Sequence, residues 1–176
     1  MLTSKDHPTG TDRLSEVASK LNLGDDEIVV NVQGDEPLIP PELITQVAQI
    51  LAEHPDAQIA TAALKIHDAV EVNNPNAVKV AMDKNCRALY FSRAPIPFTR
   101  DADKFQAQCY RHIGMYAYTA SFLKQYCSWT SSPLEQIESL EQLRILWQGE
   151  KILVQLVDKT PPAGVDTIED LKRVET

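Results

Sequence analysis

Two acidic residues, Asp35 and Glu36, follow an apolar run and are the first candidates for chemistry. Residues 28–32 are mostly β-branched, which predicts a buried strand, and Gly34 permits a tight turn after it. Ligands of open α/β sheets bind at the carboxyl ends of strands, and Mg²⁺ prefers carboxylate, phosphate and water oxygens. Asp35 is therefore a candidate magnesium ligand, and the alternative, that these acids only end the strand, stays open.

A second acid, Asp166, follows Gly164-Val165 at an expected strand-to-helix junction. The glycine would let the carboxylate point out of the fold, and two aspartates on separate loops could hold one metal ion. Aspartate is also a favourable N-cap, and Asp166 with Glu169 forms the pattern of a capping box. Both interpretations, ligand and cap, stay open.

Other polar residues lie at the ends of expected elements. The segment from His7 to Arg13 enters the first helix with hydroxyl and free N–H groups that suit a base or ribose, or that only cap the helix. Arg93 ends one expected strand and suits either a carboxylate ligand or a surface ion pair. His112 begins another strand, and suits either a sugar hydroxyl or a structural role. In the amphipathic helix expected at 133–144, only the acids of the first turn could reach a cleft.

The elements that would position these groups alternate between helix and strand. Apolar spacing predicts helices at 11–22, 40–51, 120–127, 133–147 and 167–174, and strands at 28–32, 58–66, 113–118 and 151–157. Segments 77–82 and 87–91 flank the turn residues Asp83-Lys84-Asn85, which predicts a hairpin. This order predicts an α/β fold with a mixed sheet and a hairpin insertion, in one domain spanning residues 1–176.

Composition limits the possible partners. The formal charge of -8 argues against a protein that coats nucleic acid or an anionic membrane. No run reaches the roughly 18 apolar residues of a membrane span, and residues 1–13 lack the apolar stretch of a secretion signal. The three cysteines show no ligand spacing, so a reduced, cytoplasmic compartment is expected.

Together these segments resemble the 3-deoxy-manno-octulosonate cytidylyltransferase (CMP-Kdo synthetase) family from end to end. The motifs that carry the resemblance are His7-x-Thr9-Gly10-Thr11-Asp12-Arg13, Val30-Asn31-Val32-Gln33-Gly34-Asp35-Glu36-Pro37, Asn74-Pro75-Asn76-x-Val78-Lys79-Val80, Tyr90-Phe91-Ser92-Arg93-Ala94-x-Ile96-Pro97, Arg111-His112-Ile113-Gly114, Pro133-Leu134-Glu135 through Leu143-Arg144, and Gly164-Val165-Asp166-Thr167. Thr9 stands where the family commonly has serine, and the hydroxyl is kept.

The resemblance implies a nucleotide-diphospho-sugar transferase fold and a magnesium-dependent transfer of CMP from CTP to 3-deoxy-D-manno-octulosonate (Kdo) with release of pyrophosphate. It also implies a homodimer in the cytoplasm that serves lipopolysaccharide synthesis. By motif matching, the residues implied are Asp35 and Asp166 for catalysis and Mg²⁺, Thr9, Gly10, Thr11 and Gln33 near the cytidine, and Arg93, His112, Tyr116, Glu135 and Gln136 around the sugar.

The chain departs from the family at its start, where nothing matches the first strand and the Arg-, Gly- and Lys-containing loop that holds the triphosphate. We therefore expect the chain to be a form truncated at the N-terminus, poorly soluble and inactive alone. A non-catalytic dimerising remnant and a cytidylyltransferase for another acid sugar, such as a sialic acid, are the alternatives.

Overall fold

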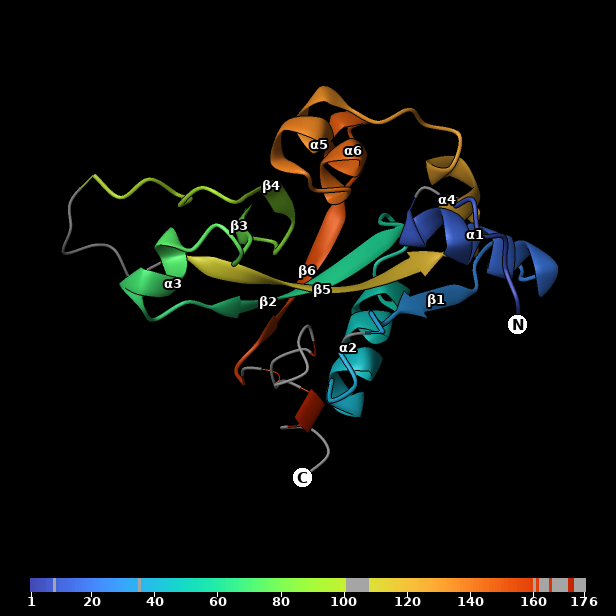
Figure 1. Ribbon diagram of the computed structural model, residues 1–176, viewed down its shortest axis with the longest axis horizontal. Helices are drawn as coiled ribbons and strands as arrows, with labels where there is room; N and C mark the ends of the chain where they lie inside the picture. Colours follow the sequence, from blue (N-terminus) through green and yellow to red (C-terminus); the bar gives the residue numbers. More distant parts are fainter. Residues whose placement is uncertain are drawn as a thin grey trace.

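The computed structural model describes residues 1–7, 9–34, 36–100, 108–159, 161, 165 and 171–172. Helices and strands follow one another along the chain (Figure 1). In order they are α1 (Gly10–Lys20), β1 (Ile28–Asn31), α2 (Pro41–Ala52), β2 (Ile59–Lys65), α3 (Ala69–Asn73), β3 (Lys79–Met82), β4 (Ala88–Ser92), β5 (Tyr110–Thr119), α4 (Ala120–Tyr126), α5 (Pro133–Glu138), α6 (Gln142–Trp147) and β6 (Ile152–Val157).

The strands form one mixed sheet, which confirms the predicted fold class. Their order is β4-β3-β5-β2-β6, and β1 also pairs with β5. Strands β2 and β6 are parallel, the other pairs are antiparallel, and β3 and β4 form the predicted hairpin. Along one side of β5, β1 pairs with residues 116–119 and β3 with residues 110–111. The sheet therefore forks between β1 and β3, next to the middle of β5.

Two apolar clusters cover the two faces of this sheet. Side chains on alternate positions of a strand point to opposite faces, and in β2 Ile59 and Ala63 join the cluster that includes α1, α4 and α6. Ala60 and Ala62 join the other cluster, under α2. Figure 1 shows α2 on the opposite side of the sheet from α5 and α6. Thr61, between Ala60 and Ala62, is polar but fully buried within this largely apolar strand.

The single helix predicted for residues 133–147 is wrong: the segment forms two short helices, α5 and α6. The first begins with a capping box, in which Ser132 and Glu135 bond to each other's backbone amides, and ends at Ser139 in a left-handed conformation (φ 53°). Leu140 is buried after this turn, so the chain changes direction to bring an apolar side chain to the core. Helix α3, which the apolar spacing did not predict, is capped by Asp68.

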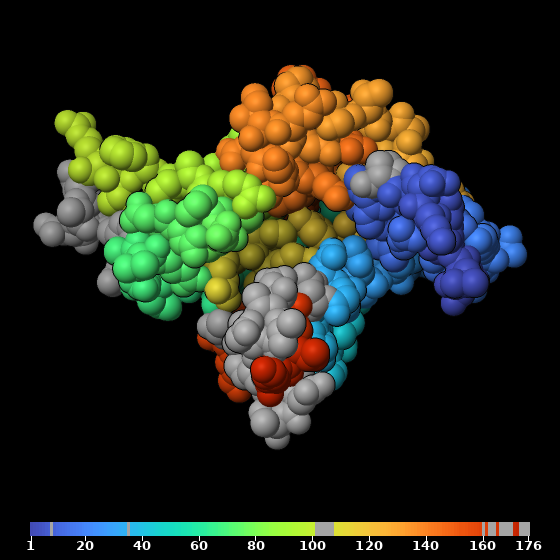
Figure 2. Space-filling view, viewed as in Figure 1, coloured from blue at the N-terminus to red at the C-terminus, as the bar shows by residue number. Residues whose placement is uncertain are grey.

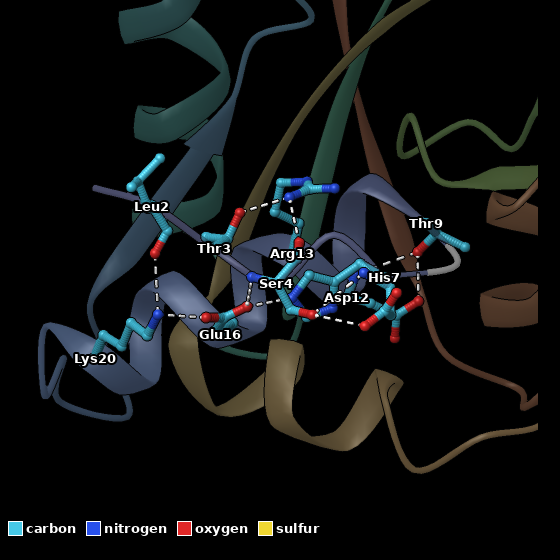
Figure 3. Close-up of polar contacts among 10 residues, drawn as sticks. Leu2, Thr3, Ser4, His7, Thr9, Asp12, Arg13, Glu16 and Lys20 are labelled. Carbon is cyan, nitrogen blue, oxygen red and sulfur yellow. Dashed lines mark hydrogen bonds and ion pairs between the residues drawn. The ribbon is translucent and has the colours of Figure 1, made fainter.

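The N-terminal segment lies along the outer side of α1 and is fastened to it by charged side chains (Figure 3). Glu16 accepts hydrogen bonds from the Ser4 amide and the His7 ring and forms an ion pair with Lys20. Arg13 donates to the Thr3 hydroxyl and to the Ser4 carbonyl. The hydrogen bonds that Glu16 accepts, from Lys20 first and then from His7 and the Ser4 amide, lower its pKa to about 2.

Candidate functional site

A cleft of about 320 Å³ opens at the fork in the sheet. In Figure 2 the recessed surface of β5 is visible between the α5–α6 segment and α1. The lining comes from six parts of the chain: Gly10 and Thr11; Asn31 and Gln33; Val78; His112, Gly114, Tyr116 and Tyr118; Tyr126; and Ser139, Leu140, Glu141, Gln142 and Ile145.

The N-terminus of α1 forms one wall of the cleft. Thr9 caps the helix by accepting a hydrogen bond from the Asp12 amide, so the cleft-lining Gly10 and Thr11 occupy the first two helical positions. Amides at these positions have no partner within a helix and carry the positive end of its dipole. They suit a polar or anionic group of a ligand.

Strand β5 forms the floor of the cleft through alternate residues. His112, Gly114, Tyr116 and Tyr118 face the cleft, while the intervening Ile113, Met115 and Ala117 pack under α2. The pairing of β5 with β2 shifts at this point, because Thr61 pairs with Tyr116 and the next residue, Ala62, pairs with Ile113. Such a bulge removes backbone groups from the ladder, and the Thr61 hydroxyl takes over one of them by donating to the Met115 carbonyl at 2.7 Å.

The same threonine contacts the imidazole of His112. Its Oγ1 lies 2.9 Å from His112 Nε2, and the ring packs between Phe91 and Tyr116. Burial lowers the pKa of His112 to about 3, so the imidazole is neutral at physiological pH. Burial also raises the pKa of Tyr116 well above its usual value, so that its hydroxyl keeps its proton. The floor of the cleft thus offers neutral hydrogen-bonding groups.

The turn between α5 and α6 forms the opposite wall. Glu141 and Gln142 line the cleft, and the Thr11 hydroxyl lies 3.4 Å from Glu141 Oε2, where it donates a weak hydrogen bond. Glu141 is reached by solvent through the cleft, but partial burial still raises the pKa of its carboxyl. The hydrogen bond from Thr11 lowers that pKa and is the smaller effect. Among the described lining residues Glu141 is the one acid, and none is lysine or arginine. This wall therefore favours neutral hydroxyl groups over anions.

Motif matching assigns Glu135 and Gln136 of this region to the sugar and does not assign Glu141 and Gln142. The signal was available, because the tripeptide Leu-Glu-Gln occurs at 134–136 and again at 140–142. The structure brings the second copy to the cleft, and Gln136 is exposed outside it. The carboxylate of Glu135 is engaged by Arg144, at 2.8 and 2.5 Å, and by the Ser132 amide.

Arg93 also lies outside the cleft lining. Its guanidinium donates to the backbone carbonyls of Glu138 and Pro75, at 2.8 and 3.1 Å, and its amide donates to the Glu138 carboxylate. The buried Lys79 donates to the carbonyls of Asn74 and Arg93. Arg93 therefore holds the end of α5, from which the chain enters the cleft wall.

Of the predicted site residues, the structure brings five together in the cleft: Gly10, Thr11, Gln33, His112 and Tyr116. Thr9 is adjacent as the helix cap, and the roles assigned to Arg93, Glu135 and Gln136 stay predictions. Asp35, Asp166 and most of the helix predicted at 167–174 lie outside the described residues. Within the described part of the chain, no group of three or more His, Cys, Asp or Glu residues could hold a metal ion. No helix among those residues is long and apolar enough to cross a membrane.

Comparison with known proteins gives consistent results. The family described as Cytidylyltransferase matches residues 1–152. The 3-deoxy-manno-octulosonate cytidylyltransferase of Polynucleobacter asymbioticus is 56% identical over 175 residues, covering 99% of this chain and 69% of the relative. A second relative, 3-deoxy-manno-octulosonate cytidylyltransferase 2 of Actinobacillus pleuropneumoniae, is 58% identical over 180 residues, covering 98% and 71%. The solved structure of a CMP:2-keto-3-deoxy-manno-octonic acid synthetase complexed with CTP superimposes with a TM-score of 0.91 at 41% identity, covering 99% of this chain and 69% of that one.

Proposed function

Because this chain belongs to the cytidylyltransferase family, and within it to the 3-deoxy-manno-octulosonate cytidylyltransferases, we propose that the protein containing it transfers CMP from CTP to Kdo. The products are CMP-Kdo and pyrophosphate. That these 176 residues are inactive alone stays a prediction. The observation that carries the proposal is the cleft at the fork of the sheet, which gathers the end of β1, the N-terminus of α1 and the polar floor of β5. Ligands of open α/β sheets commonly bind beside the carboxyl ends of strands, and Gln33, just after β1, lines this cleft.

In this reaction the anomeric hydroxyl oxygen of Kdo attacks the α-phosphorus of CTP. The bond from that phosphorus to the oxygen bridging to the β-phosphate breaks, pyrophosphate leaves, and the hydroxyl proton passes to solvent. No covalent enzyme intermediate is needed, so the residues act by positioning the two reactants, which is worth about 7–11 kcal/mol in favourable cases. Gln33 and the first amides of α1 would hold the nucleotide, and His112 and Tyr116 would bind sugar hydroxyls.

The charge of the cleft wall supports one orientation of the sugar. Glu141 would repel the carboxylate of Kdo and the phosphates of CTP, and its oxygens accept hydrogen bonds from hydroxyl groups. We therefore place the hydroxyl-bearing part of the sugar against Glu141 and Gln142, with its carboxylate directed away from them. Mutating Glu141 to Gln should then weaken the discrimination between sugars more than it changes the affinity for CTP.

We propose that Asp35 and Asp166 hold a magnesium ion. Two carboxylates suit the preference of Mg²⁺ for hard oxygen ligands, and Gln33, two residues before Asp35, lines the cleft. When bound, the ion would supply positive charge that offsets the repulsion between the two anionic substrates. A homodimer in the cytoplasm, supplying CMP-Kdo for lipopolysaccharide synthesis, completes the proposal.

The test is pyrophosphate release by the protein that contains these 176 residues, with CTP and Kdo, with CTP and a sialic acid, and with CTP alone. We expect release with Kdo only, and its loss after chelation of divalent metals. Asp35→Asn and Asp166→Asn should abolish turnover, while the exposed Asp26→Asn should not. Faster release with sialic acid would assign another acid sugar, and no release together with no binding of CTP would indicate a non-catalytic protein.

A further inference from the structure

The hydroxyl of Thr61 has three polar atoms within hydrogen-bonding distance, but it has only one proton to donate. Oγ1 lies 2.7 Å from the Met115 carbonyl oxygen, 3.2 Å from the Ile113 carbonyl oxygen and 2.9 Å from His112 Nε2. Thr61 is 0% exposed, so water does not supply an alternative partner from outside. The arrangement must therefore be satisfied within the protein.

The proton of this hydroxyl lies on the side of Met115. Two oxygen atoms approach to 2.7 Å only when a proton lies between them, and the carbonyl oxygen of Met115 has none to give. With its proton committed, Oγ1 can only accept from His112, so Nε2 carries the imidazole hydrogen. The neutral ring has one hydrogen in total, which leaves Nδ1 with a free lone pair.

The bulge in β5 links this arrangement to the cleft. It takes the Met115 carbonyl out of the ladder with β2 and gives it to Thr61, while Gly114 and His112 on either side of Ile113 line the cleft. A valine at position 61 would fill the same volume without the hydroxyl. The choice of threonine inside an otherwise apolar stretch of β2 is explained by the hydrogen bonds that it makes.

We propose that Thr61 is a positioning residue that holds His112 in the Nε2–H tautomer, so that Nδ1 accepts a hydrogen bond from a hydroxyl of the acceptor sugar. The identity of the sugar rests on the proposed function, but the tautomer does not. Because desolvation lowers the pKa of His112, its neutral ring is suited to hydrogen bonding rather than to removing the proton of a hydroxyl at neutral pH.

The first experiment needs no substrate. Long-range ¹H–¹⁵N correlation spectra of the protein should show His112 as the Nε2–H tautomer in the wild type and in Thr61→Ser, which keeps the hydroxyl. In Thr61→Val the tautomer should shift or become mixed. An Nδ1–H tautomer in the wild type, or an unchanged tautomer in Thr61→Val, would overturn the proposal whatever the protein catalyses.

The second experiment tests the consequence for the ligand. Losing one neutral hydrogen bond should raise the KM for the sugar acid roughly two- to tenfold in Thr61→Val, with the KM for CTP unchanged and with rescue in Thr61→Ser. Thr45→Val, an exposed threonine of α2, is the matched control and should change neither constant. Equal changes in both KM values, or no rescue by serine, would show that Thr61 serves only the packing of the sheet. If the protein does not use Kdo at all, the spectra still decide the tautomer.

Discussion

Removing one partner of the ion pair between Glu135 and Arg144 should be among the most destabilising single changes in this fold. The guanidinium donates to both oxygens of Glu135, at 2.8 and 2.5 Å, and stacks 4.6 Å from the centre of the Tyr126 ring. The side chains of Arg144 and Glu135 are only 9% and 10% exposed. Burial alone would raise the pKa of Glu135, but the hydrogen bonds from Arg144 and from the Ser132 amide outweigh it and lower that pKa.

Removing one partner leaves the other charge buried. We therefore expect Glu135→Gln, and separately Arg144→Met, to lower the free energy of unfolding by about 3–5 kcal/mol each. The double variant should be destabilised by less than the sum of the two, by a coupling energy of about 2 kcal/mol, because it leaves neither charge unpaired. The exposed pair Lys124–Asp25, 50% and 72% exposed, is the control, and Asp25→Asn should change stability by about 0.5 kcal/mol or less.

The assay is urea denaturation with the slope of each transition compared between variants. A local readout is hydrogen exchange at the Leu140 amide, which bonds to the Glu135 carbonyl and should exchange faster in the single variants. Losses below about 1 kcal/mol in both single variants, or strict additivity in the double, would refute the argument that this pair is desolvated and holds the α5–α6 turn. An increase in the KM for the sugar without loss of stability would instead favour the sugar-binding role predicted for Glu135.

Three further predictions concern the cleft and the pH dependence. Gly114→Ala should leave stability unchanged, because a Cβ there meets nothing within 4 Å, but it should weaken ligand binding by filling the cleft. Gly24→Ala, outside the cleft, should change neither stability nor binding, and calorimetry measures both. Below pH 6.5 the unfolded chain protonates His112, whereas the folded protein does so only near pH 3. The free energy of unfolding should therefore fall by about 1.4 kcal/mol for each unit by which the pH is lowered between these values. His112→Asn should remove that part of the pH dependence, as measured by urea denaturation at each pH. The hydrogen bonds that lower the pKa of Glu16 stabilise the N-terminal segment above about pH 4.5, and this stabilisation is lost as the pH falls toward 2. Exchange at the Ser4 amide should therefore accelerate over that window in the wild type and be fast throughout in Glu16→Ala.

The amino-acid sequence was enough to predict most elements and the class of the fold. Apolar periodicity located β1, α2, β2 and β6 within a few residues, and the turn residues at 83–85 located the β3–β4 hairpin. These features depend on neighbours in the chain, so a local pattern can predict them. The break at Ser139 was missed because the amphipathic pattern continues through it, and a left-handed residue other than glycine or asparagine gives little local signal.

The composition of the cleft was decided by tertiary structure. Motif matching supplied Gly10, Thr11, Gln33, His112 and Tyr116. It could not distinguish the two Leu-Glu-Gln copies, and the turn between α5 and α6 brings only the second copy to the cleft. In the same way, Thr61 reads as one position of an apolar strand, and its role follows from a register shift between β2 and β5 that lie about fifty residues apart. Sequence patterns report which face of an element is buried, whereas hydrogen bonds between distant strands depend on their register, which only the folded chain defines.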